Sequence, residues 1–231
     1  MIKIESLNQF YGESHTLWDV DISIKQGECI CLMGRNGVGK TTLLKSIMGL
    51  LPMASGSMLF EGEEIAKLPA ERRAKLGIGY VPQGRDIFPQ LTVEENLRIG
   101  LGARRTKSKE IPEKIFELFP VLKQMMNRRG GDLSGGQQQQ LAIGRALVID
   151  PKMLILDEPT EGIQPNIVHD IGSILLKLNQ EEGITILTVE QKLPFARRVG
   201  QRFILMDRGR KVAEGDMPDL DEKLIQQYLT V

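Results

Sequence analysis

The sequence predicts an α/β fold with a largely parallel central sheet, and two observations lead to this. A glycine-rich loop at residues 34–42 follows a short apolar run and precedes helix-forming residues, which gives the order strand, loop, helix. Two further apolar runs, residues 153–156 and 184–189, have the length of strands that are buried on both faces. Such strands occur in sheets that helices cover, and ligands bind at their carboxyl ends.

The first part of the chain predicts an antiparallel pair of strands, because residues 2–7 and 20–24 alternate apolar and polar side chains. Between these runs, Phe-Tyr-Gly at residues 10–12 is either a turn packed on the core or a platform for a flat base. The residues alone favour the core, and we expect Trp18 in the core as well. The two cysteines, Cys29 and Cys31, alternate along one strand and are expected to pack on one face of it.

The loop at residues 34–42 fits the phosphate-loop pattern G-x-x-x-x-G-K-[ST]. Glycines let backbone N–H groups turn toward phosphate oxygens, and the helix N-terminus adds a positive field. We expect Lys40 to reach the outer phosphates of a nucleotide and the Thr41 hydroxyl to ligate Mg²⁺. The alternative is a chance glycine loop. The residues expected to contact nucleotide are Gly34, Arg35, Asn36, Gly37, Val38, Gly39, Lys40, Thr41 and Thr42.

The next elements are expected to be a helix that Pro52 ends, a short strand, a helical turn and a further strand, at residues 43–51, 58–60, 70–75 and 77–82. The last strand leads to Gln83. A neutral side chain at a strand end could contact a metal or a water, although a single glutamine is more often an ordinary surface residue.

Residues 84–150 are expected to form a helical insertion. Its first helix is predicted to begin at a capping box formed by Thr92 and Glu95. A basic linker at residues 104–109 is interpreted as a solvated loop. The two helices on either side of this linker are expected at residues 91–101 and 111–126.

A second helix start with phosphate-binding character lies at residues 132–137, which read Asp-Leu-Ser-Gly-Gly-Gln. A serine and two glycines at a helix start can form an anion-binding nest, or Ser134 can simply be the N-cap. The chain has one nucleotide loop but two helix starts that can bind phosphate. This indicates that one of the two acts for a neighbouring chain.

Two carboxylates end the apolar run at residues 153–156. Asp157 suits Mg²⁺, directly or through water, and Glu158 suits the polarisation of a water for in-line attack on a γ-phosphate. The alternative is a strand that enters a charged turn. The remaining elements are expected to be a helix, a strand, a hairpin and a closing helix, at residues 167–178, 184–189, 203–213 and 221–229.

Composition narrows the function. The 231 residues carry 30 basic and 30 acidic side chains, and this zero formal charge argues against a general nucleic-acid binder. No apolar run approaches the length of a membrane span, and the first residues do not resemble a signal peptide. Any membrane role is therefore expected from the cytoplasmic side, through a partner.

These motifs together resemble the ATP-binding subunit of ABC transporters across nearly the whole chain. The phosphate loop, the acidic motif at residues 154–158, Gln83 as the Q-loop and Leu-Ser-Gly-Gly-Gln at residues 133–137 carry the resemblance. It implies a P-loop NTPase fold with a RecA-like core, an N-terminal antiparallel β subdomain and a helical signature subdomain. The implied division is a nucleotide-binding core, residues 1–83 and 151–231, and a signature subdomain, residues 84–150.

The resemblance also implies roles for single residues. It places the adenine on Tyr11, which replaces the core interpretation of that side chain, and it implies ATP hydrolysis with Mg²⁺. Two subunits of this family sandwich two ATP molecules, so the signature is implied to act on the partner's nucleotide. The implied catalytic residues are Lys40, Gln83, Glu158 and Gln191, the metal ligands are Thr41, Gln83 and Asp157, and the signature contacts are Ser134, Gly135, Gly136 and Gln137.

Two departures from the family pattern bear on the rate and symmetry of hydrolysis. The family usually ends the strand at Val189 with Thr-His, and its histidine contacts the γ-phosphate, whereas this chain has Glu190 and Gln191. Glutamine can donate a hydrogen bond but cannot become a cation. The D-loop, usually Ser-Ala-Leu-Asp, reads Glu-Gly-Ile-Gln at residues 161–164, so its aspartate is replaced by Gln164.

The chain resembles the branched-chain amino-acid importer group in having Val-Glu-Gln at residues 189–191 and no C-terminal regulatory domain. Residues 83–89 and 157–165 are most similar to the urea-transporting branch of that group. The implied partners are a second ATPase subunit, two transmembrane permease subunits and, indirectly, a periplasmic solute-binding protein, with no nucleic acid. The implied location is peripheral, on the cytoplasmic face of the inner membrane. Two alternatives stay open: a soluble ABC ATPase of translation or DNA repair, and a regulatory subunit with weak hydrolysis.

Overall fold

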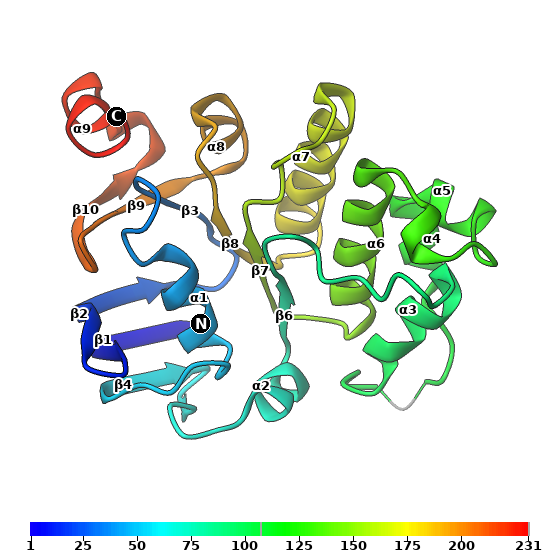
Figure 1. Ribbon diagram of the computed structural model, residues 1–231, viewed down its shortest axis with the longest axis horizontal. Helices are drawn as coiled ribbons and strands as arrows, with labels where there is room; N and C mark the ends of the chain where they lie inside the picture. Colours follow the sequence, from blue (N-terminus) through cyan, green and yellow to red (C-terminus); the bar gives the residue numbers. More distant parts are fainter. Residues whose placement is uncertain (107, 231) are drawn as a thin grey trace.

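Two sheets organise the computed structural model, which describes residues 1–106 and 108–230 (Figure 1). Within these residues, one sheet has six strands in the order β10-β9-β3-β8-β7-β6. All neighbours pair in parallel except β9 and β10, which pair antiparallel. This confirms the predicted α/β class with a largely parallel sheet. The strands are β3 (Cys29–Met33), β6 (Ile78–Val81), β7 (Met153–Asp157), β8 (Thr185–Val189), β9 (Arg202–Asp207) and β10 (Arg210–Asp216).

The second sheet is antiparallel, in the order β2-β1-β4-β5. Its strands are β1 (Ile2–Tyr11), β2 (Ser14–Ile24), β4 (Ser55–Phe60) and β5 (Glu63–Glu64). The predicted pairing of residues 2–7 with 20–24 is confirmed, with Ile2 opposite Ile24. Both strands extend further than predicted, so that β1 and β2 form one long hairpin.

Helix α1 (Lys40–Ile47) lies between the two sheets and directly follows the glycine loop. It begins three residues before the predicted start, because Lys40 and Thr41 themselves form its first turn. It ends at Ile47 and not at Pro52, since Gly49 takes a left-handed φ of 71° that a continuing helix cannot accommodate.

Strand β3 is buried on both faces, which explains its unbroken apolar run. Ile30 and Leu32 pack with α1 and the antiparallel sheet, whereas Cys29 and Cys31 belong to the core cluster on the opposite face. That cluster includes residues of α6 (Gly135–Val148), α7 (Pro165–Gln180) and α8 (Leu193–Val199). Both cysteines are buried and free, as predicted. This two-sided burial holds the start of the glycine loop at the carboxyl end of β3.

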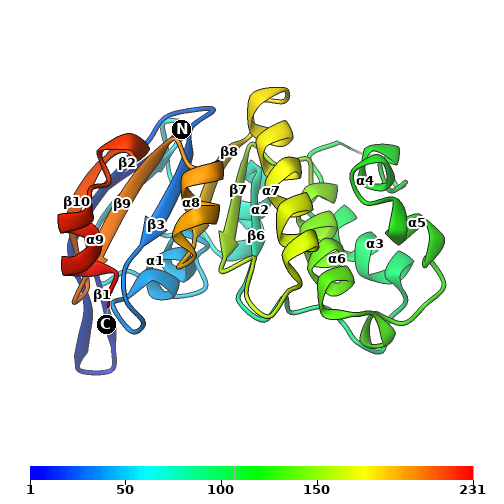
Figure 2. The ribbon, with the colours of Figure 1, turned by 90° about the horizontal axis from the view of Figure 1, so that it is seen from above.

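Helices from residues 93–148 gather at one side of the parallel sheet, away from the antiparallel sheet (Figures 1 and 2). The predicted capping box at Thr92 and Glu95 is confirmed. The single helix predicted over residues 111–126 is wrong: Pro120 lacks a backbone N–H and divides it into two short helices. Lys107, within the predicted basic linker, lies outside the described residues. The helices are α3 (Val93–Leu101), α4 (Glu113–Leu118), α5 (Pro120–Gln124) and α6 (Gly135–Val148).

The remaining helices are α2 (Ala70–Leu76), α7 (Pro165–Gln180), α8 (Leu193–Val199) and α9 (Glu222–Tyr228). Figure 2 shows α7 and α8 side by side along the parallel strands. Among the residues that the structure describes, no helix has both the length and the apolar character needed to cross a bilayer.

The prediction that Trp18 lies in the core is wrong, since 37% of its surface is exposed. Leu17 and Val20 fill the core from β2, and Trp18 lies on the outer side of the sheet. There its ring is 3.5 Å, centroid to centroid, from the ring of His15, and the guanidinium of Arg210 lies 5.1 Å from the Trp18 ring centre. Such cation–π contacts stabilise an exposed tryptophan without burying it.

Candidate functional site

The glycine loop needs glycine at two positions for different reasons. Gly34 has a φ of 147°, and a Cβ there would lie 2.4 Å from the carbonyl oxygen of Met206. Gly39 has a left-handed φ of 107° at the N-cap of α1. With these two residues in place, the loop turns tightly from the end of β3 into the N-terminus of α1, where free N–H groups point toward an anion.

Lys40 is 5% exposed, and its ammonium group is held by the loop itself. It donates to the carbonyl oxygens of Gly34 at 2.7 Å and Arg35 at 2.8 Å. Burial lowers the pKa of Lys40, and the carboxylates of Glu158 and Asp157 oppose this change. A buried ammonium group whose hydrogen bonds go to neutral carbonyl oxygens is suited to attract a multiply charged anion.

Asp157, at the carboxyl end of β7, is 1% exposed. Burial raises its pKa, the nearby Thr41 hydroxyl lowers it, and the Glu158 carboxylate raises it further. Despite this proximity to Thr41, neither carboxylate oxygen has a hydrogen bond of normal geometry within the described residues. Buried polar atoms are normally paired, so these oxygens, beside a threonine hydroxyl, fit a hard cation such as Mg²⁺.

Glu158 takes a left-handed backbone conformation, with a φ of 50°, at the point where the chain leaves β7. Its carboxylate accepts a hydrogen bond from the amide of Gln83 at 3.3 Å and another from the amide of Gln191. Gln83 also donates to the carboxylate of Glu161 at 3.1 Å. Three segments far apart in the sequence therefore meet at one carboxylate, a contact that the sequence analysis did not predict; the catalytic roles of Gln83, Glu158 and Gln191 stay predictions.

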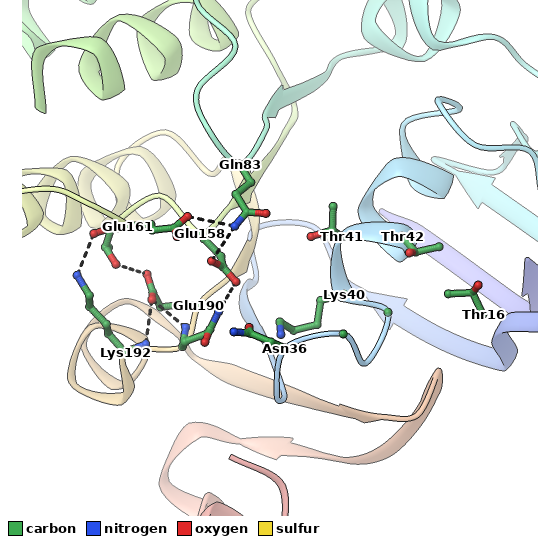
Figure 3. A pocket seen from close by; sticks show the side chains of 14 residues that line it. Thr16, Asn36, Lys40, Thr41, Thr42, Gln83, Glu158, Glu161, Glu190 and Lys192 are labelled. Carbon is green, nitrogen blue, oxygen red and sulfur yellow. Dashed lines mark hydrogen bonds between the residues drawn. The ribbon is translucent and has the colours of Figure 1, made fainter. Parts of the chain in front are cut away.

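These groups border one cavity of about 530 Å³, with the loop residues on one side and the carboxylates on the other (Figure 3). Lys40 and Thr41 face Glu158 and Gln83 across it. The lining residues are Thr16, Asn36, Gly37, Gly39, Lys40, Thr41, Thr42, Gln83, Glu158, Thr160, Glu161, Glu190, Gln191 and Lys192.

Four residues of the predicted phosphate loop and acidic motif do not line this cavity: Gly34, Arg35, Val38 and Asp157. Val38 is 7% exposed and contributes to the core between the sheets. Arg35 points out of the loop and donates to the carbonyl oxygen of Gln227 in α9 at 3.4 Å. Contacts of Arg35 and Val38 with a nucleotide stay predictions.

Tyr11 is 48% exposed and Phe10 is 41% exposed, so the core interpretation of these aromatic residues is wrong. Phe10 stacks on His15, with ring centroids 4.0 Å apart. Tyr11 lies at the end of β1, opposite Ser14, and does not contribute to the lining of the cavity. The role of Tyr11 as an adenine platform stays a prediction.

The signature residues lie apart from the phosphate loop, in a second cavity of about 480 Å³. Ser134 is the N-cap of α6, and its reciprocal hydrogen bonds with Gln137 form a capping box. Gly162 and Gln164 line the same cavity. The N-cap interpretation of Ser134 is confirmed, and one chain does not bring its two helix starts together.

Arg85 connects three of these segments, a feature that the sequence analysis did not identify. Its guanidinium donates to the side-chain oxygen of Gln138 on α6 and to the backbone carbonyl of Glu161, each at 3.3 Å. Its own carbonyl accepts from Arg145 at 3.2 Å. Arg85 therefore links the Gln83 loop, the loop after β7 and the signature helix.

The sequence analysis also missed Thr160, Glu190 and Lys192, which line the cavity around Gln191. Glu190 is 2% exposed and accepts a hydrogen bond from the hydroxyl of Thr160 at 2.7 Å. The sequence did contain a signal for Glu190 as a functional residue, because it is a carboxylate directly after a buried strand. Its partner is thirty positions away, so the contact could not be read from local sequence.

The fold and the cavity define a nucleotide-binding protein with a phosphate loop between a parallel strand and a helix. Two carboxylates lie at the carboxyl end of β7, which is separated from β3 by β8. The family model described as "ABC transporter" matches residues 17–161. The chain belongs to the ABC transporter family and is one of its ATPases.

Curated relatives and solved structures agree with this family. The chain is 41% identical over 213 residues to the high-affinity branched-chain amino acid transport ATP-binding protein BraG of Pseudomonas aeruginosa, covering 92% of this chain and 91% of BraG. It is also 41% identical to a probable branched-chain amino acid transport ATP-binding protein LivF of Archaeoglobus fulgidus, covering 96% and 94%. The dimeric post-hydrolysis structure of the ATP-binding cassette MJ0796 with ADP and Pi matches with a TM-score of 0.85 at 29% identity, covering 94% and 99%.

Proposed function

We propose that this chain is a Mg²⁺-dependent ATPase subunit that powers the import of a small polar solute. The observation that carries the proposal is the cavity in which Lys40 and Thr41 face Glu158, while Gln83 and Gln191 hold the carboxylate of Glu158. A phosphate-binding loop opposite an oriented carboxylate is the arrangement that phosphoryl transfer to water requires.

The phosphates of ATP would bind the N–H groups of residues 34–42 and the ammonium group of Lys40. Thr41 and Asp157 would hold the metal, with the side-chain oxygen of Gln83 as a further donor. Mg²⁺ bound with ATP would neutralise charge on the β- and γ-phosphates. The unpaired buried oxygens of Asp157 support this assignment, because oxygen donors are the ligands that Mg²⁺ prefers.

Glu158 would accept the proton of the attacking water, and Gln191 would donate to the γ-phosphate or to that water. Gln83 and Gln191 already orient the Glu158 carboxylate, which reduces the reorganisation needed before attack. Gln191 stays neutral, so any stabilisation that it gives to the departing phosphate comes from a hydrogen bond and not from a full charge.

The site would be completed by a second ATPase subunit, whose signature residues would cover the ATP held by this chain's loop. The separate position of Ser134 and Gly136 supports this, because within one chain they lie in a different cavity. The dimeric arrangement of the cassette MJ0796 gives independent support. The matching signature of this chain would serve the ATP of its partner.

The remaining partners would be two membrane permeases and, through them, a periplasmic solute-binding protein, with this chain on the cytoplasmic face of the inner membrane. The exposed side chains of Phe88 and Ile99 would contact a permease. Two relatives, BraG and LivF, are named for branched-chain amino acid transport, which supports that solute class. Urea is the alternative that residues 83–89 and 157–165 favour.

The test is to isolate the complex from native membranes through an affinity tag on this chain. We expect permeases and a second ATPase subunit to co-purify, and solute-loaded binding protein to stimulate phosphate release with either leucine or urea. The Lys40→Ala chain should assemble normally but bind ATP weakly. Recovery of ribosomes or DNA in place of permeases, or normal ATP affinity in Lys40→Ala, would contradict the proposal.

A further inference from the structure

A buried carboxylate lies directly beside the catalytic residues and is fully engaged in hydrogen bonds. Glu190 follows β8 and is 2% exposed. Its Oε1 accepts from the backbone N–H of Gln191 at 2.8 Å and of Lys192 at 2.9 Å, and its Oε2 accepts from the hydroxyl of Thr160 at 2.7 Å. Burying a carboxylate is costly unless hydrogen bonds compensate it, and three such bonds are present here.

Thr160 is held at its hydroxyl and at its carbonyl oxygen by the two residues that flank Gln191. Glu190 accepts from its hydroxyl, and the ammonium group of Lys192 donates to its carbonyl oxygen at 2.9 Å. Thr160 lies two positions after Glu158, in the loop that leaves β7. The turn that carries Gln191 and the loop that carries Glu158 are therefore tied together through Thr160.

We propose that Glu190 is a positioning residue for the hydrolysis step. It fixes the first two N–H groups of the turn after β8, and this sets the direction in which Gln191 points. It also fixes Thr160, and this sets the loop of Glu158. The inference rests on the proposed function, in which Glu158 and Gln191 serve the reacting phosphate and water.

The geometry explains why a carboxylate is needed. All three partners of Glu190 are donors, and a carboxylate offers two oxygens to accept from them. A glutamine at 190 would keep one oxygen for the two backbone N–H groups, and its amide could donate to the Thr160 hydroxyl, which can also accept. An alanine would leave all three donors without this partner, and of these links only the bond from Lys192 to the Thr160 carbonyl would still join the two loops.

The experiment compares Glu190→Ala, Glu190→Gln and Thr160→Val in the complex purified through this chain, with kcat and KM for ATP measured for each. We expect Glu190→Ala to lower kcat about tenfold or more with KM within about twofold, since the phosphate loop is unchanged. Glu190→Gln should retain most of the wild-type kcat. Adding Thr160→Val to Glu190→Ala should cause little further loss, because both changes break one link.

A normal kcat in Glu190→Ala, or a raised KM with kcat preserved, would overturn the inference, because a purely structural carboxylate would not change kcat selectively. If Glu190→Ala does not fold, Thr160→Val decides, because it removes the hydroxyl that donates to Glu190: an unchanged kcat in Thr160→Val would overturn the inference. Measuring Glu158→Gln in parallel distinguishes a failure of the proposed function from a failure of the role given to Glu190. If Glu158→Gln hydrolyses ATP normally, the proposed function fails; if it is inactive while Glu190→Ala is normal, only the role of Glu190 fails.

Discussion

The side-chain amide of Gln191 donates a hydrogen bond to the carboxylate of Glu158, and the amide of Gln83 donates to the same group from another strand end. The carboxylate is therefore held between two neutral donors. Neither neighbour forms a salt bridge with it, which suits a base that must accept a proton from water.

Replacing Gln191 with histidine should make hydrolysis faster. A protonated imidazole gives a charge-assisted hydrogen bond, and a gain of about 1 kcal/mol corresponds to about a fivefold higher rate. The gain should be larger at pH 6 than at pH 8, since histidine loses its proton between them. Initial rates of phosphate release across this range measure it, with Gln191→Ala as the control that should be slower. An equal or lower rate at every pH would contradict a limiting role of Gln191.

Truncating Tyr11 should weaken ATP binding, because base stacking on an aromatic ring is worth about 1–3 kcal/mol, or about 5- to 150-fold in affinity. Calorimetry with ATP and with inorganic tripolyphosphate separates the base from the phosphates, and only ATP should bind more weakly to Tyr11→Ala. Phe10→Ala is the matched control, since Phe10 stacks on His15. Equal losses in both variants, or none in Tyr11→Ala, would contradict the adenine role.

Replacing Asp157 with asparagine should stabilise the nucleotide-free chain. Burial raises the pKa of Asp157, so the folded chain holds that proton more tightly than the unfolded chain, and stability falls as pH rises above the ordinary value of 3.8. Removing this buried charge should raise the free energy of unfolding by about 1 kcal/mol at pH 7, which corresponds to a Tm higher by about 2–4 °C. The difference in Tm between Asp157→Asn and the wild-type chain should become smaller toward pH 4.

Thermal melting in EDTA from pH 4 to pH 8 tests this, with the exposed Asp170→Asn as a control without effect. The same Asp157→Asn chain should lose the Mg²⁺-dependent part of its ATP binding. A lower Tm at pH 7, or unchanged Mg²⁺ dependence, would mean that Asp157 has a structural role only.

Arg85→Lys should lower kcat while leaving ATP affinity unchanged, because Arg85 links the loop after β7 to the signature helix and lies outside the cavity lining. A lysine cannot reproduce the fork of a guanidinium, and two lost hydrogen bonds of about 0.5–1 kcal/mol each predict about a five- to thirtyfold loss. A double-mutant cycle with Gln138→Ala in the assembled complex measures the coupling. Fully additive effects would contradict the link.

The sequence predicted the site best where the chemistry is local. The phosphate loop requires glycines at fixed spacing, and the carboxylates follow directly from a buried strand, so residues 34–42, Asp157 and Glu158 could be recognised without a structure. Gln83 and Gln191 could be assigned only through a family resemblance. Their shared contact with Glu158 depends on the order of the strands in the sheet, which no local pattern contains.

The errors in the sequence prediction also have physical causes. Trp18 lies on the outer side of a twisted hairpin, where stacking with His15 and Arg210 replaces burial. The helix expected at residues 111–126 is broken at Pro120, a residue that the apolar periodicity does not register. Glu190 was missed because its significance lies in burial and in a partner thirty positions away.

The most direct measurement is steady-state phosphate release by the membrane complex that carries Glu158→Gln, alongside its ATP affinity. An amide has nearly the same shape as the carboxylate but cannot take a proton from water. Loss of a general base costs about 100- to 10,000-fold in rate, so kcat should fall by this amount while ATP affinity stays within about twofold. A variant that releases phosphate at the wild-type rate would show that Glu158 does not activate the water.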